Sequence, residues 1–176
     1  MLNSTQIKSI IAFGEGYTTE FKVSIPSNLK GITEEVCAFA NASGGVVLIG
    51  VDDENNIKGI TIDNPKRSAI QNSINEISPS LQCEFYFVDV DGKNLAVIEV
   101  PSGQNKPYVL SGAIYLRQGP NSQRLTTVEE MRNFFQQTDR IFFDEVSCVE
   151  ANIENDISKE NIKTFRFEAE LVNATS

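Results

Sequence analysis

The sequence predicts an α/β (α+β) fold in which helices pack on a mixed β-sheet. Segments with apolar residues at helical spacing alternate with strand-like segments along most of the chain, an order typical of helices layered on a sheet. The continuous apolar run 46–51 is the pattern of a strand covered on both faces. Asp91-Gly92 separates two further strand-like segments and predicts a tight antiparallel hairpin.

Four segments are expected to form helices, because their apolar residues recur at intervals of three and four. Ser4 and Thr127 come first in two of these segments and are the predicted N-caps. Gly44 and Gly45 follow another and are interpreted as its C-terminal signal. The predicted helices cover residues 4–13, 28–42, 64–78 and 128–137.

Strands are expected where β-branched and aromatic residues cluster between Gly, Pro and Asp residues. Phe85 and Phe87 alternate along one of these strands and are expected to face the core rather than to form a stacking platform. Residues 117–124 are expected to form the loop after the last strand. The predicted strands cover residues 18–23, 46–51, 83–90, 94–100 and 113–117.

The chain of 176 residues is long enough for one domain with a substantial core. We expect this domain at residues 1–138 and an acidic C-terminal extension at residues 139–176, with a last helix at 159–171, as the start of a region that continues in a longer protein. The net charge is -9, but residues 1–140 carry 12 basic and 16 acidic side chains, whereas residues 141–176 carry 3 and 8. The acidic composition is therefore compatible with a basic face on the domain.

The absence of histidine from the whole chain excludes several classes of site. Histidine-based acid–base catalysis, Ser-His-Asp and Cys-His nucleophiles and histidine-containing zinc sites all require this residue. Any proton transfer must therefore use carboxylates, Lys, Tyr or bound water.

Cysteine usage and the N-terminal sequence predict a cytoplasmic protein. Cys37, Cys83 and Cys148 are far apart and match no CxxC spacing, so we expect them to be small buried residues in a reducing compartment. The N-terminus lacks the pattern of a signal peptide, and no apolar run approaches the roughly 20 residues of a membrane span. No membrane partner is expected.

The glycine pair also bears on nucleotide binding. Gly44-Gly45 follows a predicted helix and precedes a predicted strand. A phosphate-binding loop has the opposite order and needs a Lys-Ser or Lys-Thr pair after its glycines. We therefore expect no ATP site in this segment.

Several blocks of the sequence resemble the Schlafen-type Alba-like (AlbA-2) domain, in order and at matching spacing. The first three are EGYTTEFK from Glu15, VCAFANASGG from Val36 and LIGVDD from Leu48. The later blocks are VPS at 100–102 with KPY at 106–108, and YLRQG from Tyr115 with Ser122. The resemblance covers residues 13–137, and the first two blocks together are highly specific.

The resemblance implies a DNA-binding domain of the kind found in bacterial proteins of the transcriptional-regulator type. Such domains often lie N-terminal to a winged-helix or ATPase-like region, and their partner would be DNA or structured RNA. In animal Schlafen proteins two such lobes form a horseshoe that cleaves transfer and ribosomal RNA with metal-assisted carboxylates. A chain with one lobe is by this resemblance expected to form a homodimer.

The resemblance also implies a carboxylate site. The positions that match the family's functional acids are Glu15, Glu20 and either Asp52 or Asp53. Three carboxylates brought together offer oxygen ligands to Mg²⁺ or Mn²⁺, which activates water or clamps a phosphodiester, and the predicted metal ligands are Glu15, Glu20 and Asp52. The structural alternative is that Glu15 is a loop carboxylate, that Glu20 pairs with a nearby Lys or caps a backbone group, and that the two aspartates shape a turn.

A second candidate site is basic and polar. Guanidinium groups and hydroxyls on loops suit phosphate contacts, which position a nucleic-acid backbone without reading its bases. The structural alternative is a solvated surface with an ion pair at its rim. The candidate binding residues are Lys22, Lys106, Tyr108, Arg117, Ser122 and Arg124.

The sequence is therefore compatible with three functions. The first is nucleic-acid binding within a regulatory protein. The second is a metal-dependent endoribonuclease that uses the three-carboxylate site. The third is a protein-interaction or oligomerisation module with neither activity.

Overall fold

The computed structural model describes residues 1–138 of the chain. The predicted helix at 159–171 and Cys148 lie outside these described residues. The α+β class that the sequence predicts is confirmed. The elements are, in order, α1 (Ser4–Phe13), β1 (Thr19–Lys22), α2 (Lys30–Asn41), β2 (Gly44–Ile49), α3 (Asn64–Ile74), β3 (Glu84–Val90), β4 (Lys93–Pro101), β5 (Val109–Leu110), β6 (Ala113–Gln118), β7 (Asn121–Arg124) and α4 (Val128–Gln137).

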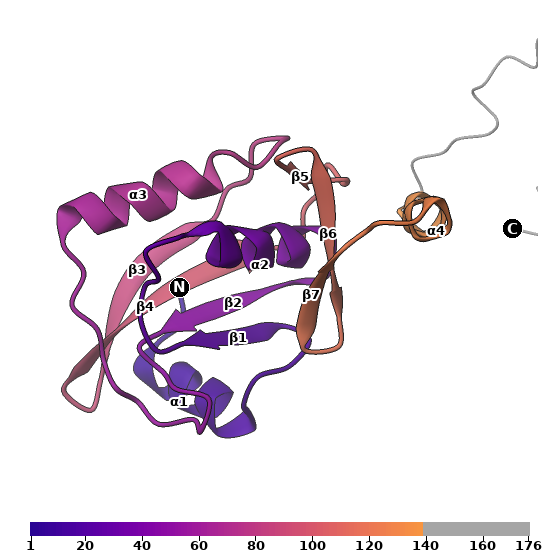
Figure 1. The fold of residues 1–176 in the computed structure, drawn as a ribbon. Coiled ribbons are helices and arrows are strands. Elements are labelled where there is room, and N and C mark those ends of the chain that lie inside the picture. The colour runs from indigo at the N-terminus through magenta and orange to yellow at the C-terminus, as the bar shows by residue number, and fades with distance from the viewer. Residues whose placement is uncertain (139–176) are drawn as a thin grey trace, which may run out of the picture. The chain divides into compact units, whose positions relative to one another are not determined.

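A four-stranded mixed sheet forms the centre of the fold, in the strand order β1-β2-β4-β3 (Figure 1). β1 runs parallel to β2, and α2 is the crossover that a parallel pair requires. β4 is antiparallel to both β2 and β3. The predicted β3–β4 hairpin is confirmed, with positive φ angles of 54° at Asp91 and 77° at Gly92, as a type I′ turn needs.

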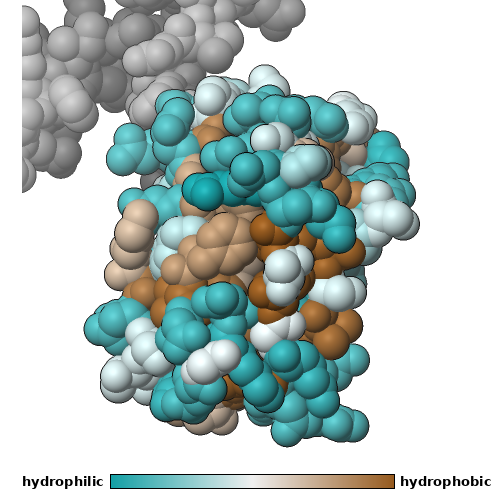
Figure 2. Space-filling view, turned by 90° about the vertical axis from the view of Figure 1, so that its left-hand side faces the viewer, coloured by the Kyte–Doolittle hydropathy of each residue, from teal (hydrophilic) through white to brown (hydrophobic). Residues whose placement is uncertain are grey.

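Helices cover both faces of this sheet, with α1 on one face and α2 and α3 on the other (Figure 1). Val46 and Leu48 of β2 pack in the cluster with α1, while Val47 and Ile49 pack in the cluster with α2 and α3. Burial on both faces explains why β2 is apolar throughout. Figure 2 shows apolar side chains reaching the surface between hydrophilic bands.

A second, three-stranded antiparallel sheet, β5-β6-β7, follows the first. Tyr115 of β6 belongs to the same core cluster as α2. The structure corrects the prediction of a loop at 117–124, because these residues form the β6–β7 hairpin, in which Arg117 pairs with Ser122. The sequence of β7 is polar and lacks β-branched residues, so only its pairing with β6 makes it a strand.

The structure corrects two further predictions. Gly44 and Gly45 lie in β2 rather than capping α2, whose C-cap is Ala42. A Cβ atom on Gly45 would come within 2.5 Å of the Phe39 ring, so close helix–strand packing requires this glycine. Phe87 is 38% exposed, because it lies on the edge strand β3 beyond the full cover of α3.

The helix starts lie within two residues of the predictions, whereas α3 ends at Ile74, four residues before the predicted end at 78. Thr127 caps α4 and forms a capping box with Glu130. The cap of α1 is Asn3 rather than the predicted Ser4, and it forms a capping box with Gln6. Among the described residues, no helix combines the length and the apolar character that crossing a membrane would require.

Candidate nucleic-acid interface

A buried polar cluster joins the two sheets at Arg117. This residue lies on β6 and is 2% exposed. Its Nη1 donates to Glu20 Oε2 on β1 at 3.3 Å and to Glu35 Oε2 on α2. Ser122 on β7 completes the cluster, because its hydroxyl accepts from Arg117 Nη1 at 3.1 Å and donates to Glu35.

The other two guanidinium nitrogens of Arg117 also donate hydrogen bonds. Nη2 donates to the carbonyl of Gly16 at 2.6 Å, and Nε donates to the carbonyl of Tyr17 at 3.3 Å. The guanidinium carbon lies 4.6 Å from the ring centroid of Phe39, a cation–π contact. A buried guanidinium must satisfy its donors in this way, since an unpaired buried charge is costly. The prediction of Arg117 as an exposed phosphate contact on a loop is therefore corrected: the side chain is interior.

The charges in this cluster balance. Glu20 also accepts a hydrogen bond from Lys22 Nζ at 2.5 Å, so two cations face two carboxylates, those of Glu20 and Glu35. Burial raises the pKa of Glu35, and the hydrogen bond to Ser122 and the charge of Arg117 oppose that shift only in part. The cluster is therefore an ion-pair network that fixes β6 and β7 against β1 and α2.

The predicted catalytic acids occupy separate positions. Glu15 Oε1 accepts from the backbone N–H of Phe21 at 2.7 Å, so this carboxylate covers the edge of β1. Asp52 organises the turn after β2, where it accepts from the backbone N–H groups of Glu54 and Asn56 and pairs with Lys58 at 2.9 Å. The hydrogen bond from Lys58 holds the pKa of Asp52 well below its usual value, at about 2.

The structure does not bring the three predicted metal ligands together. Glu20 lies within the sheet opposite Val47, whereas Asp52 lies in the turn after β2. Asp53 is exposed in the same turn as Asp52. Across residues 1–138, no group of three His, Cys, Asp or Glu side chains has the arrangement to hold a metal ion. The carboxylates that do converge are Glu20 and Glu35, and Arg117 lies between them.

Asn41 fixes the loop that precedes the second sheet. Its Nδ2 donates to the carbonyls of Tyr108 at 2.8 Å and Tyr115 at 2.9 Å, and its Oδ1 accepts from the N–H of Tyr108 at 2.7 Å. Tyr108, a predicted binding residue, is buried and lies against Gly103, where a Cβ atom would come within 2.0 Å of its ring. Tyr108 is therefore part of the core cluster rather than of the surface.

Lys106 has a structural contact at the end of α2. Its Nζ donates to the carbonyl of Ala42, the C-cap residue, at 2.5 Å, and to Ser102 Oγ at 3.1 Å. A cation suits the C-terminal end of a helix dipole. Partial burial lowers the pKa of this ammonium. Lys106 is half-buried and has no carboxylate partner within residues 1–138.

Arg124 on β7 is the exposed cation of this region. Its side chain has no hydrogen bond and no ion pair with any other described residue. The whole segment 100–128 contains no Asp or Glu and carries Lys106, Arg117 and Arg124 as its charges. Of the six predicted binding residues, Arg124 is thus the one that the structure leaves exposed and unpaired, while Lys22 and Ser122 belong to the Arg117 cluster.

Sequence reasoning missed two residues of this region, Glu35 and Asn41. Asn41 had a readable signal, because it lies on the apolar face of α2 four residues after Cys37, where a polar side chain needs a buried partner. Glu35 had none, since a glutamate within a helix is normally solvated. Its partner Arg117 is 82 residues away in the sequence.

One solved structure has a similar fold. The DIP2311 protein from Corynebacterium diphtheriae matches with a TM-score of 0.52 and 19% identity over 76% of this chain. The chain spans 28% of the length of that protein. The N-terminal domain of a "Putative ATP-dependent DNA Helicase RecG-related Protein" from Nitrosomonas europaea matches with a TM-score of 0.47 and 27% identity, over 72% of this chain and 95% of that one. A search of curated proteins found no match.

A family comparison agrees with the motifs and with the architecture described above. The family description "Schlafen, AlbA_2" matches residues 15–126, which include β1 through β7 and the whole Arg117 cluster. The matched segment begins at Glu15, whose carboxylate covers the edge of β1, and ends just after the β6–β7 hairpin. The chain therefore belongs to the Schlafen AlbA_2 family.

Proposed function

We propose that this domain binds nucleic acid through phosphate contacts made by the acid-free segment 100–128. The observation that carries the proposal is Arg124, an exposed cation without a carboxylate partner in the described residues, within a segment that has no acidic side chain. Membership of the Schlafen AlbA_2 family supports it. A guanidinium on a rigid strand suits bidentate contact with a phosphate.

The surroundings of Arg124 also favour a polyanion. The exposed neighbours on the hairpin are neutral amides, Gln118, Asn121 and Gln123, which donate hydrogen bonds to phosphate oxygens and do not repel them. Arg117 supports this surface from the interior, because its ion pairs with Glu20 and Glu35 hold the β6–β7 hairpin in place. The proposed contacts of this hairpin are to phosphate oxygens, which carry no sequence information, so the binding proposed for it is independent of sequence.

The proposed binding is tested by measuring the affinity of the full chain for duplex DNA and for structured RNA across a range of salt concentrations. We expect log K to fall linearly with log salt, and Arg124→Ala to lower the affinity and to reduce the slope by about 0.9. The matched control is Lys8→Ala, which removes the same charge from α1 on the opposite face of the main sheet. Absence of binding at low salt, or an unchanged slope for Arg124→Ala, would contradict the proposal.

A further inference from the structure

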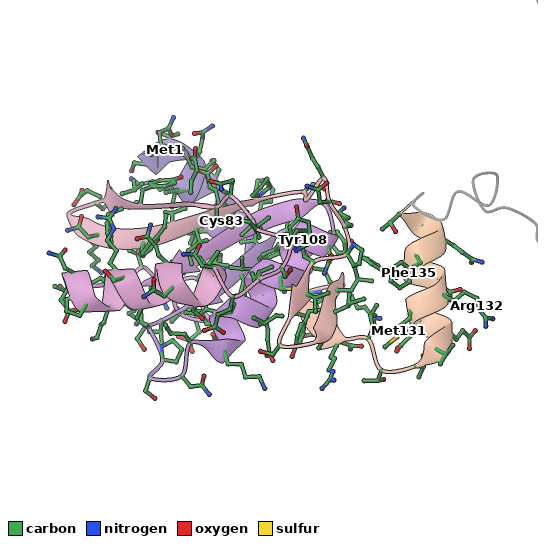
Figure 3. The ribbon with its side chains drawn as sticks, turned by 90° about the horizontal axis from the view of Figure 1, so that it is seen from above. Met1, Cys83, Tyr108, Met131, Arg132 and Phe135 are labelled. Atoms are coloured by element: carbon green, nitrogen blue, oxygen red, sulfur yellow. The ribbon has the colours of Figure 1, made fainter. Side chains whose placement is uncertain are left out.

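We propose that a cavity between α3 and β3 binds an unpaired adenine base of a single-stranded nucleic acid. The cavity has a volume of about 310 Å³ and lies between the C-terminal half of α3 and the residues that lead into β3, among them Cys83, which Figure 3 labels. This size falls at the lower end of the range of small-molecule sites. The inference deepens the proposed function, on which it rests for the source of the base.

The wall of the cavity is formed by neutral amides. Gln71, Asn72, Asn75 and Gln82 line it, and none of these four side chains has a hydrogen-bond partner among the residues that the structure describes. No charged side chain lines it. Primary amides present both donors and acceptors, so they match an uncharged ligand whose edge also carries both. Asn and Gln make bidentate hydrogen bonds to adenine in this way.

The floor of the cavity is apolar and includes an aromatic ring. Its apolar lining residues are Ile74 and Leu81, which are buried, and Phe85, which is partly buried. The Phe85 ring is partly exposed and lies 5.6 Å from the Phe87 ring, centroid to centroid. A flat ligand with polar edges therefore finds a stacking partner below and hydrogen-bond partners around it, which is how proteins bind unstacked bases.

A cation beside the cavity indicates that the base belongs to a strand. Arg67, Gln71 and Asn75 follow one another at intervals of four residues and so share one face of α3. The guanidinium of Arg67 lies 5.9 Å from the Phe85 centroid and 5.8 Å from that of Phe87, and it has no carboxylate partner within residues 1–138. This guanidinium is placed to contact the phosphate or the next base of a strand whose base occupies the cavity.

Nuclear magnetic resonance tests the cavity directly, because the side-chain NH₂ groups of Gln and Asn give their own signals. We titrate the full chain with adenosine, with ribose and with a short oligo(dA) strand. We expect the signals of Gln71, Asn75 and Gln82 to shift with adenosine and not with ribose. Oligo(dA) should bind at least about tenfold more tightly than adenosine, through the added phosphate contacts.

Two variants make the test specific. Gln71→Leu and Asn75→Leu change exposed side chains and should each weaken oligo(dA) binding by about tenfold, the effect of losing one bidentate base contact. Gln136→Leu on α4 is the matched control and should bind as the native chain does. Backbone amide spectra show that each variant is folded.

The outcomes separate the two proposals. If adenosine leaves the three amide signals unchanged, or if ribose moves them equally, the adenine site is overturned, whatever the salt dependence of duplex binding shows. If adenosine shifts them but oligo(dA) binds no more tightly, the strand as the source of the base is overturned. If Arg124→Ala loses duplex binding while adenosine still shifts the three amide signals, the phosphate-binding surface and the adenine site are both supported and act independently of each other.

Discussion

Arg117 illustrates how much a single residue depends on its surroundings in this domain. On a loop this arginine would be an exposed cation, but on β6 it is buried, and it contacts Glu20, Glu35 and Ser122. Removal of one member of such a network leaves buried charges without a counterion, which is more costly than never burying them.

Replacement of Arg117 should therefore destabilise the fold strongly. We expect Arg117→Met to lower the free energy of unfolding by about 3–5 kcal/mol, measured by urea denaturation at neutral pH. Glu35→Gln in the same chain should restore part of this loss, because it removes the carboxylate that Arg117→Met leaves without a cation, whereas Glu20 keeps its ion pair with Lys22.

The pH dependence of the same variant gives an independent check. The pKa of Glu35 is raised by burial, so protonation of this carboxyl favours the folded state, and that contribution is lost as the pH rises through the raised pKa. The stability difference between Arg117→Met and the native chain should thus narrow as the pH falls below neutrality. A difference that stays constant between pH 7 and pH 5 would show that the carboxylates are not the cause.

At the scale of elements, the turn after β2 depends on one carboxylate. Asp52 accepts two backbone N–H groups and pairs with Lys58, so it determines the course of the chain between β2 and Gly59. The sequence already indicated this role, because Asp and Asn residues in such a cluster favour turns.

Asp52→Asn should reduce stability in a pH-dependent manner. The folded pKa of Asp52 is about 2 against an ordinary value of 3.8, so its contribution is complete above the ordinary value and is lost as the pH falls toward 2. We expect the thermal midpoint of Asp52→Asn to lie below that of the native chain at pH 7 and the two midpoints to converge between pH 4 and pH 2. Asp53→Asn, one residue away and exposed, is the control and should leave the thermal midpoint unchanged at pH 7 and at pH 2.

At the scale of the whole described domain, two buried side chains attach the second sheet to the first layer. Arg117 makes contacts from the hairpin to β1 and α2, and Asn41 makes three hydrogen bonds from α2 to the backbone of Tyr108 and Tyr115. This attachment gives the proposed binding surface a fixed geometry. Arg124 is therefore held in position by the contacts of Arg117 and Asn41 rather than by contacts of its own side chain.

Asn41→Ala should loosen the second sheet in preference to the first. Three hydrogen bonds to buried backbone groups would be lost, although the Tyr108 carbonyl keeps the weaker one from Cys37 Sγ, and a buried group left unsatisfied costs about 1–3 kcal/mol. Hydrogen exchange should become faster in β5 and β6 than in β3 and β4, provided that opening stays local. Asn94→Ala on β4, an exposed asparagine, is the control. Equal acceleration in both sheets would show that Asn41 supports the whole fold rather than the attachment.

Much of the fold could be predicted from the sequence, because periodicity and turn chemistry are local. The apolar run of β2, the Asp91-Gly92 turn and the Thr127 cap each depend on a few neighbouring residues, and all three are confirmed. β5 and β7 were missed, since a two-residue strand and a polar strand form only through pairing: β7 pairs with β6, and β5 pairs with β6 and bridges Ser78.

The candidate site was predicted less well than the fold. The motifs identified the family and the part of the chain that contains the candidate site, from Glu15 to Arg124. They did not identify which side chains meet, since the carboxylates that converge are Glu20 and Glu35 rather than Glu15, Glu20 and Asp52. That outcome depends on strand register, which a single sequence does not encode locally.

The sequence by itself determined the fold class, the order of the main elements, the family and the exclusion of histidine chemistry. Only the tertiary structure decided that Arg117 is an interior ion-pair partner and Arg124 an exposed cation, although both are arginines of one hairpin. The physical reason is distance along the chain. Glu20 and Arg117 are separated by 97 residues and meet only when the two sheets pack together. Burial then makes that contact an ion pair, and Arg124 stays available at the surface.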